Sequence, residues 1–305
     1  MEIDDVHVEV IGPRGSRALS LFEKKVLFWD LEGLKTEIAI SCIRNLRFSQ
    51  IFQLAKAKAM LFLGKRSCAY ELEKRALIAG IIATDIESIR IRWSGRDLVF
   101  GYTDDLPVLL KQIILQNQYC LTKENVEGKI IIDAGANVGV FSMCAAALGA
   151  KKVYAFEPVR QTFGILQQNV ASNGFEGIIL PVNTGLGDET GKTTLFYDGE
   201  GGDGGASIVL KCDGRKIEVI DIATIDSFMS SRGERVGFIK IDTEGYERQV
   251  LAGARETITR DKPVLSFSAY HFKEDKAELP KVVNGIRGDY KCTLNNFGEE
   301  DFYCE

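Results

Sequence analysis

Four residues in the middle of the chain have the types and the spacing of a nucleoside-binding site. One apolar run ends in Asp133 and leads into a turn that contains Gly135 and Gly139. A second apolar run ends in Glu157, 22 residues after Gly135. One strand–helix–strand unit needs this distance to bring a carboxylate to the hydroxyls of a ribose at the carboxyl edge of a parallel sheet.

The glycine pattern of the turn indicates which nucleoside would fit. Gly135 allows a tight turn that can lie against a ligand without a Cβ in the way, and Gly139 allows the next helix to begin close to the strand. A dinucleotide site has G-x-G-x-x-G, whereas this turn has Asn137 where the middle glycine should stand. The bulkier loop leaves less room for pyrophosphate and favours a ligand with one ribose and no phosphate tail, such as S-adenosylmethionine. The structural alternative, in which Asp133 only caps the turn and Glu157 is a solvated acid, explains the combination less well.

The segments that must position these residues alternate between strand and helix patterns from about residue 130 onward. This alternation is typical of a Rossmann-like, doubly wound α/β fold with a mostly parallel sheet. The predicted strands are 129–133, 152–156, 178–182, 236–242 and 263–269, and the predicted helices are 140–148, 159–172 and 246–259. Residues 290–294 and 301–304 are predicted to form a terminal hairpin that pairs antiparallel at one edge of the sheet.

The amino-terminal part of the chain is less regular. Residues 89–93 and 98–102 alternate with period two around a polar turn, which predicts a hairpin. An amphipathic helix is predicted near 44–63. We therefore expect a smaller α+β extension over 1–85, able to serve as a substrate or oligomer layer, and a catalytic domain over 86–305 with the hairpin and a helix as its lead-in.

The composition excludes several classes of protein. Hydrophobic residues at 45% and charged residues at 27% are ordinary for a globular chain, and the net charge is −5. The seven cysteines contain no C-x-x-C pair, and an odd, scattered set suits a reducing compartment better than a disulfide framework. The amino terminus lacks a signal-peptide pattern, and no apolar run reaches the roughly 20 residues that cross a bilayer. We expect a soluble, cytoplasmic protein with no membrane contact.

Three segments resemble one protein family over about residues 116–305. They read IIDAGANVGVFS, VYAFEPVRQTFGILQQNV and FIKIDTEGYERQVLAGA, and they resemble the FkbM-type family of class I S-adenosylmethionine-dependent methyltransferases. The resemblance implies a seven-stranded sheet and transfer of a methyl group, usually to a hydroxyl oxygen.

The resemblance also implies roles for single residues. Residues 133–139 would wrap the methionine part of the cofactor, and Glu157, followed by Pro158, would bind the ribose. Residues 183–187, which begin with Asn183, would border the adenine. Tyr119 would close over the cofactor, although a core tyrosine explains it equally well.

The acceptor is expected at the end of the fourth strand, where Asp242 stands. A hydroxyl acceptor loses a proton on methylation, which requires a base or a metal. Asp242 and Glu244 are the nearest candidates, and His271, after the fifth strand, could accept the proton as a neutral imidazole. Alternatively, Asp242 bonds backbone amides, Glu244 serves a helix amino terminus, and His271 is an ordinary strand-end residue. A metal site of these three residues is conceivable, but the sequence fixes no ligand geometry and we predict no metal.

The leading hypothesis is O-methylation of a small molecule or saccharide. Residues 41–66 carry six basic residues and no acidic one, which allows an alternative as an RNA methyltransferase that grips phosphates. A solvated helix face is the favoured interpretation of this segment, so a nucleic-acid partner is disfavoured. A nicotinamide-dependent oxidoreductase and a catalytically silent binding module are two further hypotheses. No motif indicates the acceptor or the oligomeric state.

Overall fold

The computed structural model describes residues 7–12, 15–19, 87–103, 105–197, 206–209, 216–296 and 299–305. The chain divides into two compact units, Glu2–Asp97 and Leu98–Glu305. The division suggested by the sequence, after residue 85, lies within the first of these units. The helix predicted near 44–63 and the basic segment 41–66 lie outside the described residues.

The first unit contains antiparallel strands. β1 (His7–Gly12) pairs with both β2 (Gly15–Leu19) and β3 (Ser88–Trp93). A two-residue turn then leads from β3 to β4 (Arg96–Gly101), within which the second unit begins. Both residues of the turn, Ser94 and Gly95, have positive φ angles, of 49° and 76°. Two central residues with positive φ are typical of the turns that close two-residue hairpins, so the strand–turn–strand prediction for this segment is confirmed.

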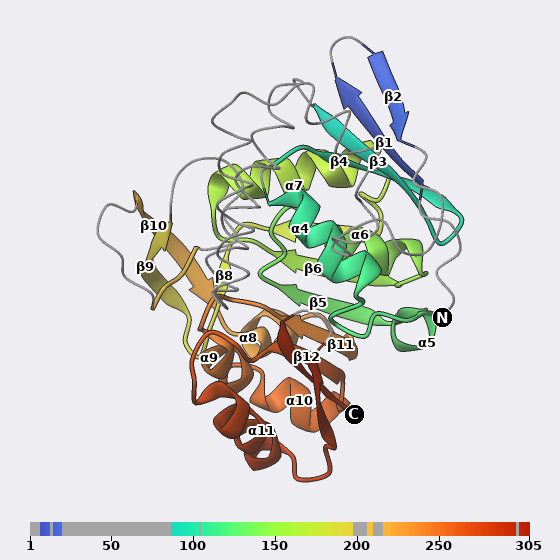
Figure 1. Cartoon of the computed structure of the whole chain (residues 1–305). Coiled ribbons are helices and arrows are strands. Elements are labelled where there is room, and N and C mark those ends of the chain that lie inside the picture. Colours follow the sequence, from blue (N-terminus) through green and yellow to red (C-terminus); the bar gives the residue numbers. More distant parts are fainter. Residues whose placement is uncertain are drawn as a thin grey trace, which may run out of the picture. The chain divides into compact units, whose positions relative to one another are not determined.

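A seven-stranded, mostly parallel sheet forms the centre of the second unit (Figure 1). Its strand order is β13-β14-β12-β11-β5-β6-β7, and only the pairs made by β13 and β14 with their neighbours are antiparallel. The strands are β5 (Ile130–Ala134), β6 (Lys152–Phe156), β7 (Ile179–Val182), β11 (Val236–Ile241), β12 (Val264–Ser268), β13 (Cys292–Asn296) and β14 (Glu300–Cys304). The predicted fold class and terminal hairpin are confirmed.

Helices cover both faces of this sheet. α6 (Val140–Ala147) and α7 (Arg160–Ser172) lie on one side, and α9 (Glu247–Ala252), α10 (Arg255–Asp261) and α11 (Asp275–Ile286) lie on the other (Figure 1). β5 is buried along its whole length, as expected for a parallel strand covered on both faces. α4 (Leu106–Leu110), a π-helical turn η1 (Lys111–Leu115) and α5 (Lys123–Val126) precede β5. None of the described helices combines the length and apolarity needed to cross a bilayer.

The single helix predicted over 246–259 is wrong, because two helices, α9 and α10, occupy this segment. The break falls at Gly253, where a Cβ atom would lie 1.9 Å from the carbonyl oxygen of Gly187. Asp226, in α8 (Ile225–Ser230), then accepts hydrogen bonds of 2.8 Å from the amides of Glu256 and Thr257 at the start of α10. The periodic apolar pattern continues across the break, so the sequence pattern does not reveal it.

A small second sheet, not predicted from the sequence, follows β7. β10 (Lys216–Ala223) pairs parallel with β8 (Gly185–Leu186) and antiparallel with β9 (Gly191–Tyr197). The glycine-rich stretch between β9 and β10 lies outside the described residues, apart from 206–209.

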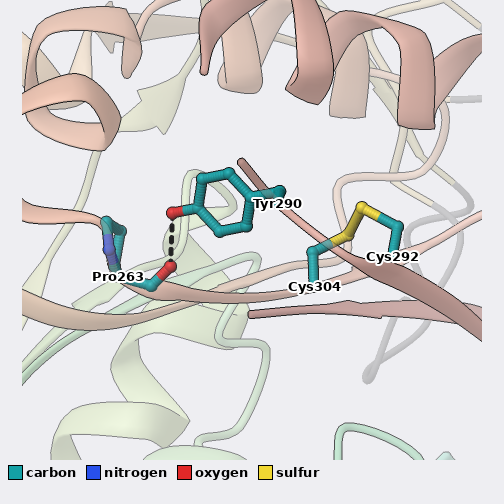
Figure 2. Close-up of a disulfide and its surroundings, with 4 residues drawn as sticks. All are labelled: Pro263, Tyr290, Cys292 and Cys304. Carbon is teal, nitrogen blue, oxygen red and sulfur yellow. Dashed lines mark hydrogen bonds between the residues drawn. A yellow bond between two sulfur atoms is a disulfide. The ribbon is translucent and has the colours of Figure 1, made fainter. Parts of the chain in front are cut away.

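Cys292 and Cys304 form a disulfide between β13 and β14 (Figure 2). The antiparallel register places the two cysteines directly opposite each other. The sequence favoured a reducing compartment over a disulfide framework, and this pair departs from that expectation because strand register, and not sequence spacing, brings the two cysteines together. Nearby, the Tyr290 hydroxyl donates a 2.6 Å hydrogen bond to the carbonyl of Pro263 (Figure 2). Cytoplasmic location stays a prediction.

Replacing Cys304 with serine is expected to lower the free energy of unfolding by about 3 kcal/mol under oxidising conditions, because the disulfide closes a loop of 12 residues in the unfolded chain. Urea unfolding followed by circular dichroism measures the difference. Reductant should destabilise the natural chain by a similar amount and leave the variant unchanged. Peptide mapping without reductant that finds both thiols free would contradict the prediction.

Candidate cofactor and acceptor site

The turn after β5 has a left-handed backbone at alternate residues. Gly135, Asn137 and Gly139 have φ angles of 75°, 51° and 90°. A Cβ atom on Gly135 would lie 1.9 Å from the carbonyl oxygen of Asp242, at the end of β11. Glycine is thus required here by contact with the neighbouring strand end, and the expected approach of a ligand to Gly135 stays a prediction.

Gly139 allows close packing between two helices. A Cβ atom there would lie 2.4 Å from Cδ1 of Leu166, in α7, and 2.8 Å from Cε of Met143, in α6. The expectation was that Gly139 lets α6 begin close to the strand, whereas these nearest atoms belong to helices. Contacts within the chain therefore shape the turn.

Glu157, at the end of β6, is bound to the same turn. Its side chain is buried, and its two carboxylate oxygens accept 2.9 Å hydrogen bonds from the amides of Asn137 and Val159. Asn183 donates from its side-chain amide to the carbonyls of Glu157 and Pro158, both at 2.9 Å. The structure thus brings together four of the residues assigned to the cofactor. Burial raises the pKa of Glu157 to about 7, although the two backbone amides oppose this shift.

Asp133 is paired with a lysine that sequence reasoning missed. Lys240 Nζ, from β11, lies 3.2 Å from Asp133 Oδ1, and both side chains are at least 95% buried. Lys240 also donates to the carbonyl of Gly135 at 2.6 Å, and Ser142 donates to the other oxygen of Asp133 at 2.6 Å. The sequence contained one indication of this pair, a lysine between apolar residues of a strand predicted to be buried. A buried charge requires a partner of opposite charge. Asp133 therefore holds the turn in place.

Asp242 is the centre of the acceptor side. Tyr119 donates to its Oδ2 at 2.7 Å, and Tyr270 donates to its Oδ1 at 3.4 Å. Burial alone would raise the pKa of Asp242, but the positive charges of Lys240 and His271 hold it below its ordinary value. Tyr119 is 4% exposed, so it is a buried tyrosine whose hydroxyl is bound to Asp242.

His271 lies between two carboxylates. Its Nε2 is 3.2 Å from Glu244 Oε2 and its Nδ1 is 3.4 Å from Glu247 Oε1, and the side chain is 4% exposed. Burial alone would lower the pKa of His271, but Glu244 and Glu247 raise it to about 11. At neutral pH the isolated chain therefore holds an imidazolium, in contrast to the expected neutral base. Burial also raises the pKa of Glu244 to about 7, and the charge of Asp242 adds to the shift.

The fold and this site define an α/β domain of the methyltransferase class. A family model described as the methyltransferase FkbM domain matches residues 133–292, which is more than half of the chain. The chain therefore belongs to the FkbM methyltransferase family, and the resemblance seen in the sequence is confirmed. No curated protein gives a significant match to the chain.

Solved structures similar to this chain are also described as methyltransferases. The methyltransferase FkbM from Methylobacillus flagellatus KT is 22% identical, with a TM-score of 0.46, over 66% of this chain and 54% of that chain. A putative rRNA-methylase from Clostridium thermocellum is 12% identical, with a TM-score of 0.42, over 62% and 93%. A precorrin-6y C5,15-methyltransferase from Geobacter metallireducens is 10% identical, with a TM-score of 0.37, over 62% and 82%. The chain spans about half the length of the FkbM structure that it matches.

Proposed function

We propose that the chain transfers a methyl group from S-adenosylmethionine to a hydroxyl oxygen of a small molecule or saccharide. The observation that carries the proposal is the junction between the turn and Glu157. Each carboxylate oxygen accepts one backbone hydrogen bond and keeps a lone pair that could accept a ribose hydroxyl. Membership of the FkbM methyltransferase family supports the same cofactor.

The use of the turn's amides argues against a dinucleotide. The amide of Asn137 donates to Glu157, and the amide of Val138 donates to the side-chain oxygen of Asn137 at 2.6 Å. A pyrophosphate would need free amides at this point of the chain. Two of them are already bonded to oxygen acceptors, which supports a nucleoside without pyrophosphate over a nicotinamide cofactor.

The acceptor side provides a carboxylate for the proton of a hydroxyl group. When bound, the cofactor supplies an electrophilic methyl group on a sulfonium. The chain would hold the acceptor hydroxyl beside that methyl group, and Asp242 would take up the hydroxyl proton. Asp242 suits this role because it is ionised, whereas His271 is already protonated at neutral pH and instead helps to position Glu244.

A buried polar cluster lies next to Asp242. Asp301 interacts with the side chains of Gln118 and Ser268, and Asp242 lies close enough for its charge to act on Asp301. Asp301 also pairs with Ser268 in the sheet. These buried groups are thus partners of one another, as buried polar groups usually are. The preference for a hydroxyl group of a small molecule or saccharide rests on the resemblance to the FkbM family. The RNA alternative depends on residues 41–66 and stays a prediction.

Replacing Glu157 with glutamine is expected to weaken the binding of S-adenosylhomocysteine by about 10- to 100-fold, because hydrogen bonds to a charged group are lost. Isothermal titration calorimetry measures this, and the matched control is Glu176→Gln, which changes an exposed acid. In the natural chain, affinity should fall as the pH drops below about 7, since Glu157 then becomes protonated. The variant should lose this pH dependence. Tighter binding of NAD than of S-adenosylhomocysteine would contradict the proposed function.

A further inference from the structure

His271 has different surroundings at its two ring nitrogens. The side chain is 4% exposed, and among the described residues neither nitrogen has a hydrogen bond of regular geometry, although carboxylate oxygens lie 3.2 Å and 3.4 Å away. Two sets of possible metal ligands share this ring, Asp242–Glu244–His271 and Glu247–His271–Asp275. The ligand atoms of each set lie within 4.8 Å of one another.

The set on the Nδ1 side is closed. Glu247 is 2% exposed, and its Oε1 accepts hydrogen bonds from the amide of Thr243 at 2.8 Å and from the amide of Gly245 at 3.3 Å. Asp275 accepts from the amide of Phe272 at 2.7 Å. Glu247 is thus held where it can accept the Nδ1 proton of His271. A carboxylate behind a histidine is the usual outer partner of a metal-binding imidazole, and it leaves the other nitrogen free to bind the ion.

The set on the Nε2 side is open. The side chains of Asp242 and Glu244 are 20% and 24% exposed. Tyr119 donates to Oδ2 of Asp242 at 2.7 Å, whereas Oδ1 accepts only a longer 3.4 Å hydrogen bond from Tyr270 and lies 3.9 Å from His271 Nε2. Glu244 has a left-handed backbone with φ of 54°, which is uncommon for a residue with a side chain and concentrates at functional sites. The carbonyl of Glu244 accepts a 2.6 Å hydrogen bond from Ser207, which helps to hold this conformation.

The charges around His271 do not balance. Three carboxylates, of Asp242, Glu244 and Glu247, face one imidazole. Even a doubly protonated ring leaves an excess of negative charge, and Lys240 is already paired with Asp133. A divalent cation at Nε2 would replace one proton of the ring and reduce the excess among these groups from two negative charges to one.

We propose that His271 Nε2, together with one carboxylate oxygen each from Asp242 and Glu244, binds a divalent cation such as Mn²⁺. One imidazole and two carboxylates suit such an ion, and three protein ligands leave open positions. The site lies at the carboxyl end of β11, beside the turn that is assigned to the cofactor. The role of the ion rests on the proposed function: it would coordinate the acceptor hydroxyl and favour loss of its proton, which would pass to water because Asp242 then ligates the ion.

The test is a titration of the full chain with Mn²⁺ at pH 7.5, in which the electron paramagnetic resonance signal reports free ion. We expect one bound ion per chain. Glu244→Gln should weaken binding by about 100-fold or more because it removes a charged ligand, and Glu247→Gln should weaken it by about 10- to 100-fold. Asp275→Asn and the exposed control Glu189→Gln should stay within about two-fold of the natural chain. Glutamine has the same size as glutamate and Glu244 is partly exposed, so the Glu244→Gln variant should fold. Circular dichroism of the variant and of the natural chain checks this.

Two results would overturn the cation site. One is no bound Mn²⁺ in a folded chain, and the other is a loss for Asp275→Asn as large as for Glu244→Gln, which would place the ion on the other side of the ring. A parallel titration with S-adenosylhomocysteine separates the two proposals. Cofactor binding without Mn²⁺ binding refutes the cation site alone. Mn²⁺ binding without cofactor binding supports the cation site and refutes the proposed function.

Discussion

Replacing Lys240 with methionine is expected to lower the free energy of unfolding by about 3–5 kcal/mol, because it leaves the fully buried carboxylate of Asp133 without its counter-charge. The substitution also removes the 2.6 Å hydrogen bond to the carbonyl of Gly135. Urea unfolding, followed by circular dichroism, measures the loss. Methionine matches the length of the lysine stem, so the change in packing is small.

A double-mutant cycle isolates the charge pair. Asp133→Asn combined with Lys240→Met removes both charges. The free energy of unfolding that the double variant loses should therefore be smaller, by about 1–3 kcal/mol, than the sum of the losses of the two single variants. The surface control is Lys192→Met. Lys192 pairs with Asp221 at 2.7 Å, but both side chains are more than 60% exposed, and the expected loss is at most about 1 kcal/mol. An equal loss for Lys192→Met and Lys240→Met would show that burial of the pair is unimportant.

Replacing Gly135 with alanine is expected to destabilise the chain by about 2–5 kcal/mol and to disturb the cofactor turn. The left-handed backbone costs about 1–2 kcal/mol for a residue with a side chain. The Cβ atom would also lie 1.9 Å from the Asp242 carbonyl, and forced displacement typically costs about 1–3 kcal/mol more. Because the turn and the end of β11 must separate, affinity for S-adenosylhomocysteine should fall as well, by about 10-fold for each 1.4 kcal/mol of binding free energy that is lost.

Gly174 provides the matched control for this substitution. Its φ angle is 66°, close to the 75° of Gly135, but no atom lies within 4 Å of an added Cβ. Gly174→Ala should therefore show only the backbone cost and leave cofactor affinity unchanged. If both variants lose the same stability, the contact between Gly135 and Asp242 has no energetic importance.

The site is organised around contacts between strand ends. Gly135 touches the carbonyl of Asp242, and Lys240 connects β11 to Asp133 and to the carbonyl of Gly135. The turn assigned to the cofactor and the carboxylate assigned to the acceptor are therefore parts of one rigid junction between β5 and β11. Methyl transfer is an in-line displacement that depends on alignment of the reacting groups, and a rigid junction suits this requirement.

The sequence alone was sufficient for the sheet and for the turn. Buried parallel strands appear as short apolar runs, because both faces are covered, and the five predicted strands of the parallel part agree with β5, β6, β7, β11 and β12 within two residues. The number of strands was expected from the resemblance to the FkbM family, whereas their order was not predicted and comes from the structure. Glu157 was identifiable because its separation from Gly135 along the sequence matches one strand–helix–strand unit. Such a unit is local in the sequence, so contacts between distant segments are not needed to recognise it.

Only the tertiary structure decided the partners of the charged residues and the ends of two elements. Lys240 lies more than 100 residues from Asp133, and the break at Gly253 depends on the carbonyl of Gly187. Sequence patterns report how each segment divides its apolar and polar residues. They do not report which atoms meet when strand ends pack together, so the imidazolium state of His271, set by Glu244 and Glu247, became visible only in the folded chain. The disulfide has the same origin, since the register of β13 and β14 places Cys292 opposite Cys304.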